Sequence, residues 1–232
     1  MSIRRFGVLI VAIAATTVFS SGCHHGLHSG VRGSGDRITQ KRPVGSFTSV
    51  VAEGAYSIDS VRQKEQSVQI EGDDNIVPLI TTEVSNNILH INTQQNFSAR
   101  EPLTIKISVP TLEGLSITGA GKIDVTDLKS EKFELDASGA PAITISGEAS
   151  LLKIDLSGAG KVDAHQVHAS QVDVDTKGVS RVDVYAVNKL DVNISGPSHV
   201  VYEGDPEVSK SISGPGSLEK KESKEAKTVS PV

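Results

Sequence analysis

The 232-residue sequence has one cysteine, no tryptophan and few aromatic side chains, which make up 3% of the chain. A single cysteine excludes both a disulfide framework within the chain and a cysteine-rich zinc site. The scarcity of aromatic residues argues against the stacking platforms with which many proteins bind sugars or single-stranded nucleic acid. The formal net charge of −5 argues against a basic nucleic-acid-binding protein. No catalytic combination of residues stands out, so we expect neither enzyme activity nor a cofactor.

The first 22 residues have the features of a bacterial export signal. Arg4 and Arg5 supply a positive start, residues 8–15 are apolar, and small residues follow them. The segment Ser-Ser-Gly-Cys at 20–23 resembles the lipobox of bacterial lipoproteins, although Ser20 stands where that motif usually has leucine. We therefore predict a signal peptide over 1–22 and attachment of lipid, such as palmitate, to Cys23. An ordinary secretory signal is the alternative.

Acyl chains on Cys23 would hold the protein at a membrane, because each buried methylene contributes about 0.8 kcal/mol. His24 follows the cysteine, and resemblance to the bacterial sorting rule then favours the outer membrane, on its periplasmic or its surface face. Residues 23–43 begin with a stretch rich in Gly, Ser and His and are predicted to be a flexible tether. We interpret His24, His25 and His28 as part of this solvated linker rather than as metal ligands, because nothing nearby completes a coordination shell.

The second half of the chain repeats itself with a period near 20 residues. Its markers are six glycines with spacings of 20, 19, 20, 18 and 18, at Gly119, Gly139, Gly158, Gly178, Gly196 and Gly214. No segment here shows a helical period, and the repeat is too short for a pair of helices. The period therefore indicates a solenoid of strands.

The residues around each glycine divide into two faces. Those at four and two positions before the glycine, and at four and six positions after it, are mostly aliphatic, as Ile154 and Val162 are around Gly158. These positions share one parity and so face one side of a strand, while the opposite parity is polar. Stacked coils of this pattern form an all-β, parallel β-helix-like solenoid with an aliphatic interior. The glycine suits a corner that has no room for a side chain or that needs a positive φ.

The remaining segments complete the expected organisation. Residues 44–112 alternate apolar and polar positions between turn signals, and we expect them to form the first coils with irregular β-hairpins. The solenoid domain then covers 44–218, and Lys210 and Lys220 in its apolar columns predict a polar cap at the last coil. Residues 219–232 are charged and end near a proline, so they are predicted to be a disordered tail.

Carboxylates also form a column in the repeat. Asp136, Asp155 and Asp175 each lie three positions before a glycine and would stack about 4.8 Å apart on adjacent coils. A calcium ion is one way to relieve their repulsion, and solvation with salt is another. We favour the solvated ladder and expect no metal, because no loop is available to wrap an ion.

A second outward column pairs each carboxylate with a basic residue two positions earlier. These pairs should neutralise each other as weak surface ion pairs. They are Lys122 with Asp124, Lys161 with Asp163, and Arg181 with Asp183.

Several segments together resemble a known bacterial family. They are GSFTSVVAEGAYSIDS, VQIEGDDNIVPLITTEV, ILHIN and LTIKISVPTLEGLSITGAGKIDV. Over about residues 44–205 the chain is similar to the "putative auto-transporter adhesin, head GIN domain" family. The resemblance implies a right-handed β-helix-like fold and export to the cell envelope, often as a lipoprotein.

We therefore expect a non-enzymatic envelope lipoprotein that presents a rigid β-solenoid, acting as an adhesin or binding a partner protein or glycan. One alternative is a polysaccharide-active β-helix enzyme that uses Asp136, Asp155 and Asp175. The other is a structural or stress-response envelope protein without a ligand.

Overall fold

The computed structural model describes residues 30–221, so Cys23, the predicted signal peptide and residues 222–232 lie outside the described part. The protein is all-β, as predicted, and its strands run from β1 (Val31–Arg32) to β15 (Ser217–Lys220). Among the described residues one 3₁₀ turn, η1 (Val77–Leu79), interrupts the strands. No helix within residues 30–221 is long and apolar enough to cross a bilayer.

Short strands form the N-terminal part. After β1 these are β2 (Arg37–Arg42), β3 (Ser49–Ala55), β4 (Ser57–Arg62), β5 (Ser67–Asp73), β6 (Ile80–Ser85), β7 (Ile88–Thr93), β8 (Phe97–Ser98) and β9 (Thr104–Val109). Long, bending strands follow, namely β10 (Gly114–Gly158), β11 (Lys161–Gly178) and β12 (Arg181–Ser195). The chain then ends with β13 (His199–Glu203), β14 (Glu207–Ser213) and β15.

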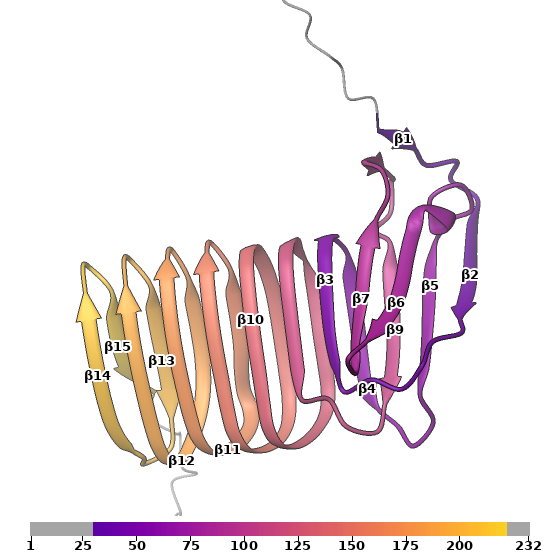
Figure 1. The fold of residues 1–232 in the computed structure, drawn as a ribbon. Helices are drawn as coiled ribbons and strands as arrows, with labels where there is room; N and C mark the ends of the chain where they lie inside the picture. Colours follow the sequence, from indigo (N-terminus) through magenta and orange to yellow (C-terminus); the bar gives the residue numbers. More distant parts are fainter. Residues whose placement is uncertain (1–29, 222–232) are drawn as a thin grey trace, which may run out of the picture.

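Successive repeats lie side by side in one long row of strands (Figure 1). One path of hydrogen-bonded neighbours runs β15-β13-β12-β11-β10-β4-β9-β5-β2, while β14 pairs with β12, and β3 joins β10 to β7. From β10 onward all pairings between strands are parallel and join equivalent repeat positions. Ile143 lies beside Val162, Val162 beside Val182, and Val182 beside Val200.

The aliphatic columns predicted from the repeat face the interior. Leu135, Ile154, Val174 and Val192 are at most 2% exposed, and so are Ile143, Val162, Val182 and Val200 in the column after the glycine. Residues of the opposite parity are partly or fully exposed along the same strands. The interior is one continuous cluster that extends from Phe47 to Val200.

Each repeat glycine sits at a corner and touches the corner of the coil before it. All six have positive φ, between 102° at Gly139 and 136° at Gly119. A Cβ atom added to Gly158 would lie 2.4 Å from the carbonyl oxygen of Gly139, and one added to Gly178 would lie 2.4 Å from that of Gly158. Glycine is therefore required at the corner both by the positive φ and by the lack of room for a Cβ atom.

The two ends of the row differ. At the N-terminal end β5 pairs antiparallel with β9 and β2, and β6 pairs antiparallel with β7. At the C-terminal end β14 is exposed along its whole length, including Val208 at 37% and Ile212 at 38% in inward-facing columns. Lys210 lies between them, beside Val192.

The structure corrects two segment boundaries. The predicted tether over 23–43 contains β1 and β2, and β2 pairs with β5 over six residues. Its sequence, RITQKR, is that of a polar edge strand held by backbone hydrogen bonds, so it carries little apolar alternation. At the other end β15 extends to Lys220, beyond the boundary placed at 218, because Glu219 and Lys220 pair with Val201 and Tyr202.

Candidate binding faces

The Asp ladder, Asp136, Asp155 and Asp175, lies on the outward side of the strands that lead into the glycine corners. Asp155 pairs in register with Asp175, which pairs with Asn193 on the next coil. Basic side chains on the same strands neutralise two of these carboxylates. Lys153 Nζ lies 2.8 Å from Asp155, and Lys177 Nζ lies 3.3 Å from Asp175. For Asp136 there is no ion pair within the described residues.

Lys153 also connects two coils. Its Nζ donates to Glu134 Oε1 at 2.8 Å on the preceding coil, and Glu134 also accepts a hydrogen bond from Lys132 at 2.9 Å. Hydrogen bonds to Asp155 and Glu134 raise the pKa of Lys153. Hydrogen bonds from Lys153 and Lys132 in turn hold the pKa of Glu134 below its usual value. The face is thus a lattice of paired charges rather than a bare row of carboxylates.

A shallow hollow of about 260 Å³ lies on this face. Its walls include four carboxylates, and it is lined by Lys153, Ile154, Asp155, Asp173, Val174, Asp175, Asp191 and Asn193. Asp173 accepts a hydrogen bond from Gln171 at 3.0 Å, and Asp191 pairs with Lys189. Within residues 30–221 no three histidine, cysteine or acidic side chains are placed to hold a metal ion. The hollow therefore offers a mostly acidic, solvated surface.

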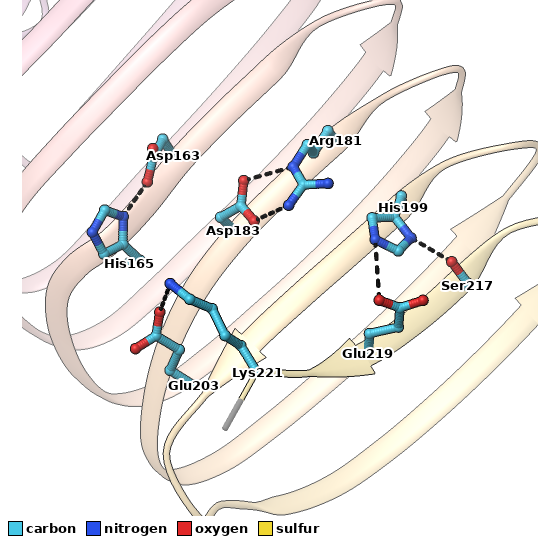
Figure 2. A network of polar contacts seen from close by, with 9 residues as sticks. All are labelled: Asp163, His165, Arg181, Asp183, His199, Glu203, Ser217, Glu219 and Lys221. Atoms are coloured by element: carbon cyan, nitrogen blue, oxygen red, sulfur yellow. Dashed lines mark hydrogen bonds and ion pairs between the residues drawn. The ribbon is translucent and has the colours of Figure 1, made fainter. Parts of the chain in front are cut away.

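The second charged column lies on the strands that leave the glycine corners, and Figure 2 shows its C-terminal part. Arg181 donates two hydrogen bonds to Asp183, of 2.8 and 3.0 Å. Lys122 likewise pairs with Asp124, so two of the three expected pairs form. The third does not, because Asp163 contacts His165 and Lys161 makes no ion pair within the described residues. Burial raises the pKa of Asp163, but the hydrogen bond and charge of His165 outweigh it and hold this pKa below its usual value.

The last coils extend this polar network. Lys221 donates to Glu203 at 2.6 Å, and His199 contacts Ser217 and lies 3.6 Å from Glu219 (Figure 2). The hydrogen bond to Glu203 and its charge raise the pKa of Lys221. No local sequence pattern indicates these contacts of His199, since its partners lie one coil away.

Two larger hollows lie elsewhere, and sequence reasoning found neither. One, of about 570 Å³, is at the corner opposite the glycines and is lined by Thr111, Glu113, Lys129, Ser130, Glu131, Glu148, Ala149, Ser150 and His168. The other, of about 540 Å³, is lined by segments 55–57, 97–103 and 120–122. Each combines segments that are distant in sequence, so no local motif marks them.

Comparison with known proteins identifies the family. The profile of the family described as "putative auto-transporter adhesin, head GIN domain" matches residues 46–206. The chain belongs to this family. No curated protein matches it in sequence.

Solved structures of other bacterial proteins share its fold. A "putative adhesin" from Bacteroides fragilis is 24% identical, with a TM-score of 0.64 over 82% of this chain and 100% of that one. A "putative adhesin" from Parabacteroides merdae is 16% identical, with a TM-score of 0.53 over 83% of this chain and 99% of that one. At such identities the likeness concerns the fold.

Proposed function

We propose that this head GIN protein is a non-enzymatic lipoprotein of the cell envelope, held at the outer membrane through acylated Cys23. Its right-handed, parallel β-helix-like solenoid would serve as a rigid adhesin or partner-binding module. The observation that carries the proposal is the regular outward lattice of charged side chains over a continuous aliphatic interior, in a family described as adhesins. Such a surface presents charged groups on several successive coils, as at Asp155 and Asp175, and suits an extended protein or glycan partner.

The charge arrangement supports binding rather than catalysis. Glycosidases need two carboxyl groups in unlike environments, so that one is protonated while the other is ionised. Asp155 and Asp175 have nearly equal side-chain exposures of 35% and 36%, and each pairs with a lysine two residues away. Asp155 and Asp175 thus lack the asymmetry that separates an acid from a base.

Binding is tested with the mature chain on a glycan array and by pull-down from intact envelopes. We expect a retained partner that is lost when Asp136 and Asp173 are both changed to alanine, with thermal unfolding unchanged. The matched control is Lys129→Ala at the opposite corner, which should keep the partner. Equal retention by both variants would remove the Asp ladder face from the proposal, and reducing-sugar release from acidic polysaccharides would favour the enzyme instead.

Lipid attachment is tested separately. Radiolabelled palmitate should enter the wild-type chain and be absent from Cys23→Ser, which should remain uncleaved or become soluble. Equal labelling of the two would contradict the lipoprotein proposal.

A further inference from the structure

The hollow of about 540 Å³ lies where the N-terminal strands meet the repeats. Its wall combines the end of β3 through Ser57, the segment from Phe97 to Leu103, and residues 120–122 at the first glycine corner. A volume of this order falls within the range of about 300–1,000 Å³ that is typical of small-molecule sites.

The lining is mainly apolar. Phe97 is partly exposed here, whereas Phe47 and Phe133 are 3% and 0% exposed within the core. Tyr56 lines the hollow although the residue is only 4% exposed, and its hydroxyl donates to the Glu53 carbonyl at 2.8 Å. Burial raises the pKa of Tyr56 to about 12, so the phenol stays neutral. Pro102 and Ala120 add further apolar surface.

Charged groups of both signs surround the hollow, and Glu53 is near enough to Tyr56 for its charge to add to the rise in the pKa of the phenol. Arg100 is exposed and makes no ion pair or hydrogen bond among the described residues. The neighbouring carboxylate, Glu101, lies 3.4 Å from Arg37, and Lys122 is paired with Asp124. Arg100 is therefore the cation that remains for an incoming anion.

The position of the hollow relates it to the membrane. β8, which carries Phe97, is held by β1 through hydrogen bonds from Val31 to Asn96 and from Gly33 to Ser98, both 2.8 Å. Val31 follows Cys23 by eight residues, a length of chain that spans at most about 29 Å. In Figure 1, β1 lies beyond the edge of the molecule at which the β14 arrow ends. A lipid anchor at Cys23 would hold this edge close to the bilayer.

The same edge carries exposed apolar side chains along the repeats, interspersed with polar ones such as Ser157 and Lys177. The residue after each glycine is small or aliphatic and exposed on successive coils, as at Ala140, Ala159 and Val179. Val179 is 62% exposed. Apolar side chains near a free cation match the boundary between acyl chains and anionic head groups.

We propose that this edge docks on an anionic lipid bilayer, with Phe97 at the acyl boundary and Arg100 on a phosphate head group. The proposal rests on the proposed lipid anchor only for its orientation, because the contact itself needs no acylated cysteine. Docking would lay the glycine corners toward the membrane and leave the opposite corner facing away from it.

The test uses the mature chain carrying Cys23→Ser, so that no anchor contributes. Sedimentation with vesicles of phosphatidylglycerol and phosphatidylethanolamine should retain the protein, and vesicles of phosphatidylcholine alone should retain much less. Arg100→Ala should lower partitioning about fivefold, because a basic residue near anionic lipid contributes about 1 kcal/mol. Lys129→Ala, at the opposite corner and 67% exposed, is the matched control and should change nothing.

A fluorescent probe locates the contact. The chain has no tryptophan, so Phe97→Trp introduces a single tryptophan, whose emission should shift to the blue and be quenched by brominated acyl chains. The same substitution at Val187, an exposed residue at the opposite corner, should remain unquenched. If Phe97→Trp does not fold, vesicle sedimentation, which needs no fluorescent probe, still tests whether this edge binds anionic lipid.

Equal partitioning of the Arg100 and Lys129 variants, or binding that ignores lipid charge, would overturn the proposal. Saturable binding of monomeric decanoate without any vesicle binding would overturn it as well and would assign the hollow to a free amphiphile. Failure of palmitate labelling would reject the anchor while leaving this vesicle result standing, so the two proposals fail separately.

Discussion

Thr176 is an exception within the aliphatic interior. It is 0% exposed in the column that also holds Leu156 and Ile194, and its Oγ1 has no hydrogen-bond partner among the described residues. A buried polar atom without a partner loses its hydration and gains nothing in return. A valine of nearly the same shape is therefore expected to be more stabilising at this position.

Replacing Thr176 with valine should raise the free energy of unfolding by about 1 kcal/mol, because the unsatisfied hydroxyl is removed at nearly constant shape. Chemical unfolding measures the change. Thr144→Val, at an exposed outward position, is the control and should shift the midpoint little. Destabilisation of the Thr176 variant would mean that the hydroxyl has a bound water or another partner.

The glycine corners involve two separate penalties for a side chain. One is the positive φ, and the other is contact with the carbonyl of the previous coil. Gly35 has a positive φ of 90° but nothing within 4 Å of an added Cβ, whereas Gly178 has both constraints. The pair allows the two effects to be measured apart.

Gly35→Ala should destabilise by about 1–2 kcal/mol through its backbone conformation alone. Gly178→Ala should cost about 1–3 kcal/mol more, because the methyl group pushes against the Gly158 carbonyl. Urea unfolding of both variants gives the difference. Equal losses would show that the coils can move apart at their corners without cost.

At the scale of a strand, the outward face is organised by ion pairs between residues two apart. Such neighbours lie on the same side of a strand, so the pairing arises within one strand and repeats along the row. Examples are Lys132 with Glu134 at 2.9 Å and Arg181 with Asp183 at 2.8 Å. Lys153 differs because it also reaches the neighbouring coil, and it should therefore matter more than the others.

The lowered pKa of Glu134 predicts a pH dependence. A carboxyl group with a lowered folded-state pKa stabilises the fold above its usual value of 4.5, and this contribution is lost as the pH falls through the folded-state pKa. Lys153→Met should remove part of it, about 0.2–1 kcal/mol for a partly exposed pair. Unfolding at about pH 7 and about pH 3 should thus show a smaller pH effect than in wild type.

Lys129→Met is the control, because Lys129 lies 3.8 Å from Glu148 and both side chains are about two-thirds exposed or more. It should leave the pH effect unchanged. An identical pH effect in the Lys153 variant would show that Glu134 does not depend on this bridge.

Sequence pattern predicted some of these elements and missed others for physical reasons. Ile154 and Val162 were correctly predicted to face the interior. The glycine period assigns each of them to a coil, and the alternation of apolar and polar residues assigns each to the inner face of its strand. β2 was missed because edge strands are held by backbone hydrogen bonds, which leave no mark in RITQKR. The contact of Asp163 with His165 instead of Lys161 could not be predicted, because it depends on side-chain conformation. The hollow beside Phe97 could not be predicted either, because three segments distant in sequence form it.

At the scale of the whole molecule, the two ends differ in how much apolar side-chain surface they expose to solvent. Antiparallel strands close the N-terminal end, while β14 leaves Val208 and Ile212 partly exposed. An edge strand with apolar side chains can pair with another chain, and an inward-facing charge prevents this. Lys210, between the two aliphatic residues, is placed to have that effect.

Lys210→Val should give β14 a continuous apolar inner side and cause concentration-dependent association, measured by analytical ultracentrifugation. Ser209→Val adds the same side chain on the outward side of the same strand and should leave the chain monomeric. A Lys210 variant that stays monomeric at high concentration would mean that something else protects this end.

The in-register stacking of the coils has a consequence for how such a protein can change in evolution. Because most positions of β11 and β12 meet the equivalent positions on the coil before, with register shifts only within 144–146 and 164–171, duplication or loss of one whole coil joins surfaces that already fit. Each such event would move the far end by roughly 4.8 Å, the spacing of neighbouring strands. The length of the row can therefore be adjusted in equal steps while both ends, and whatever each one contacts, stay the same.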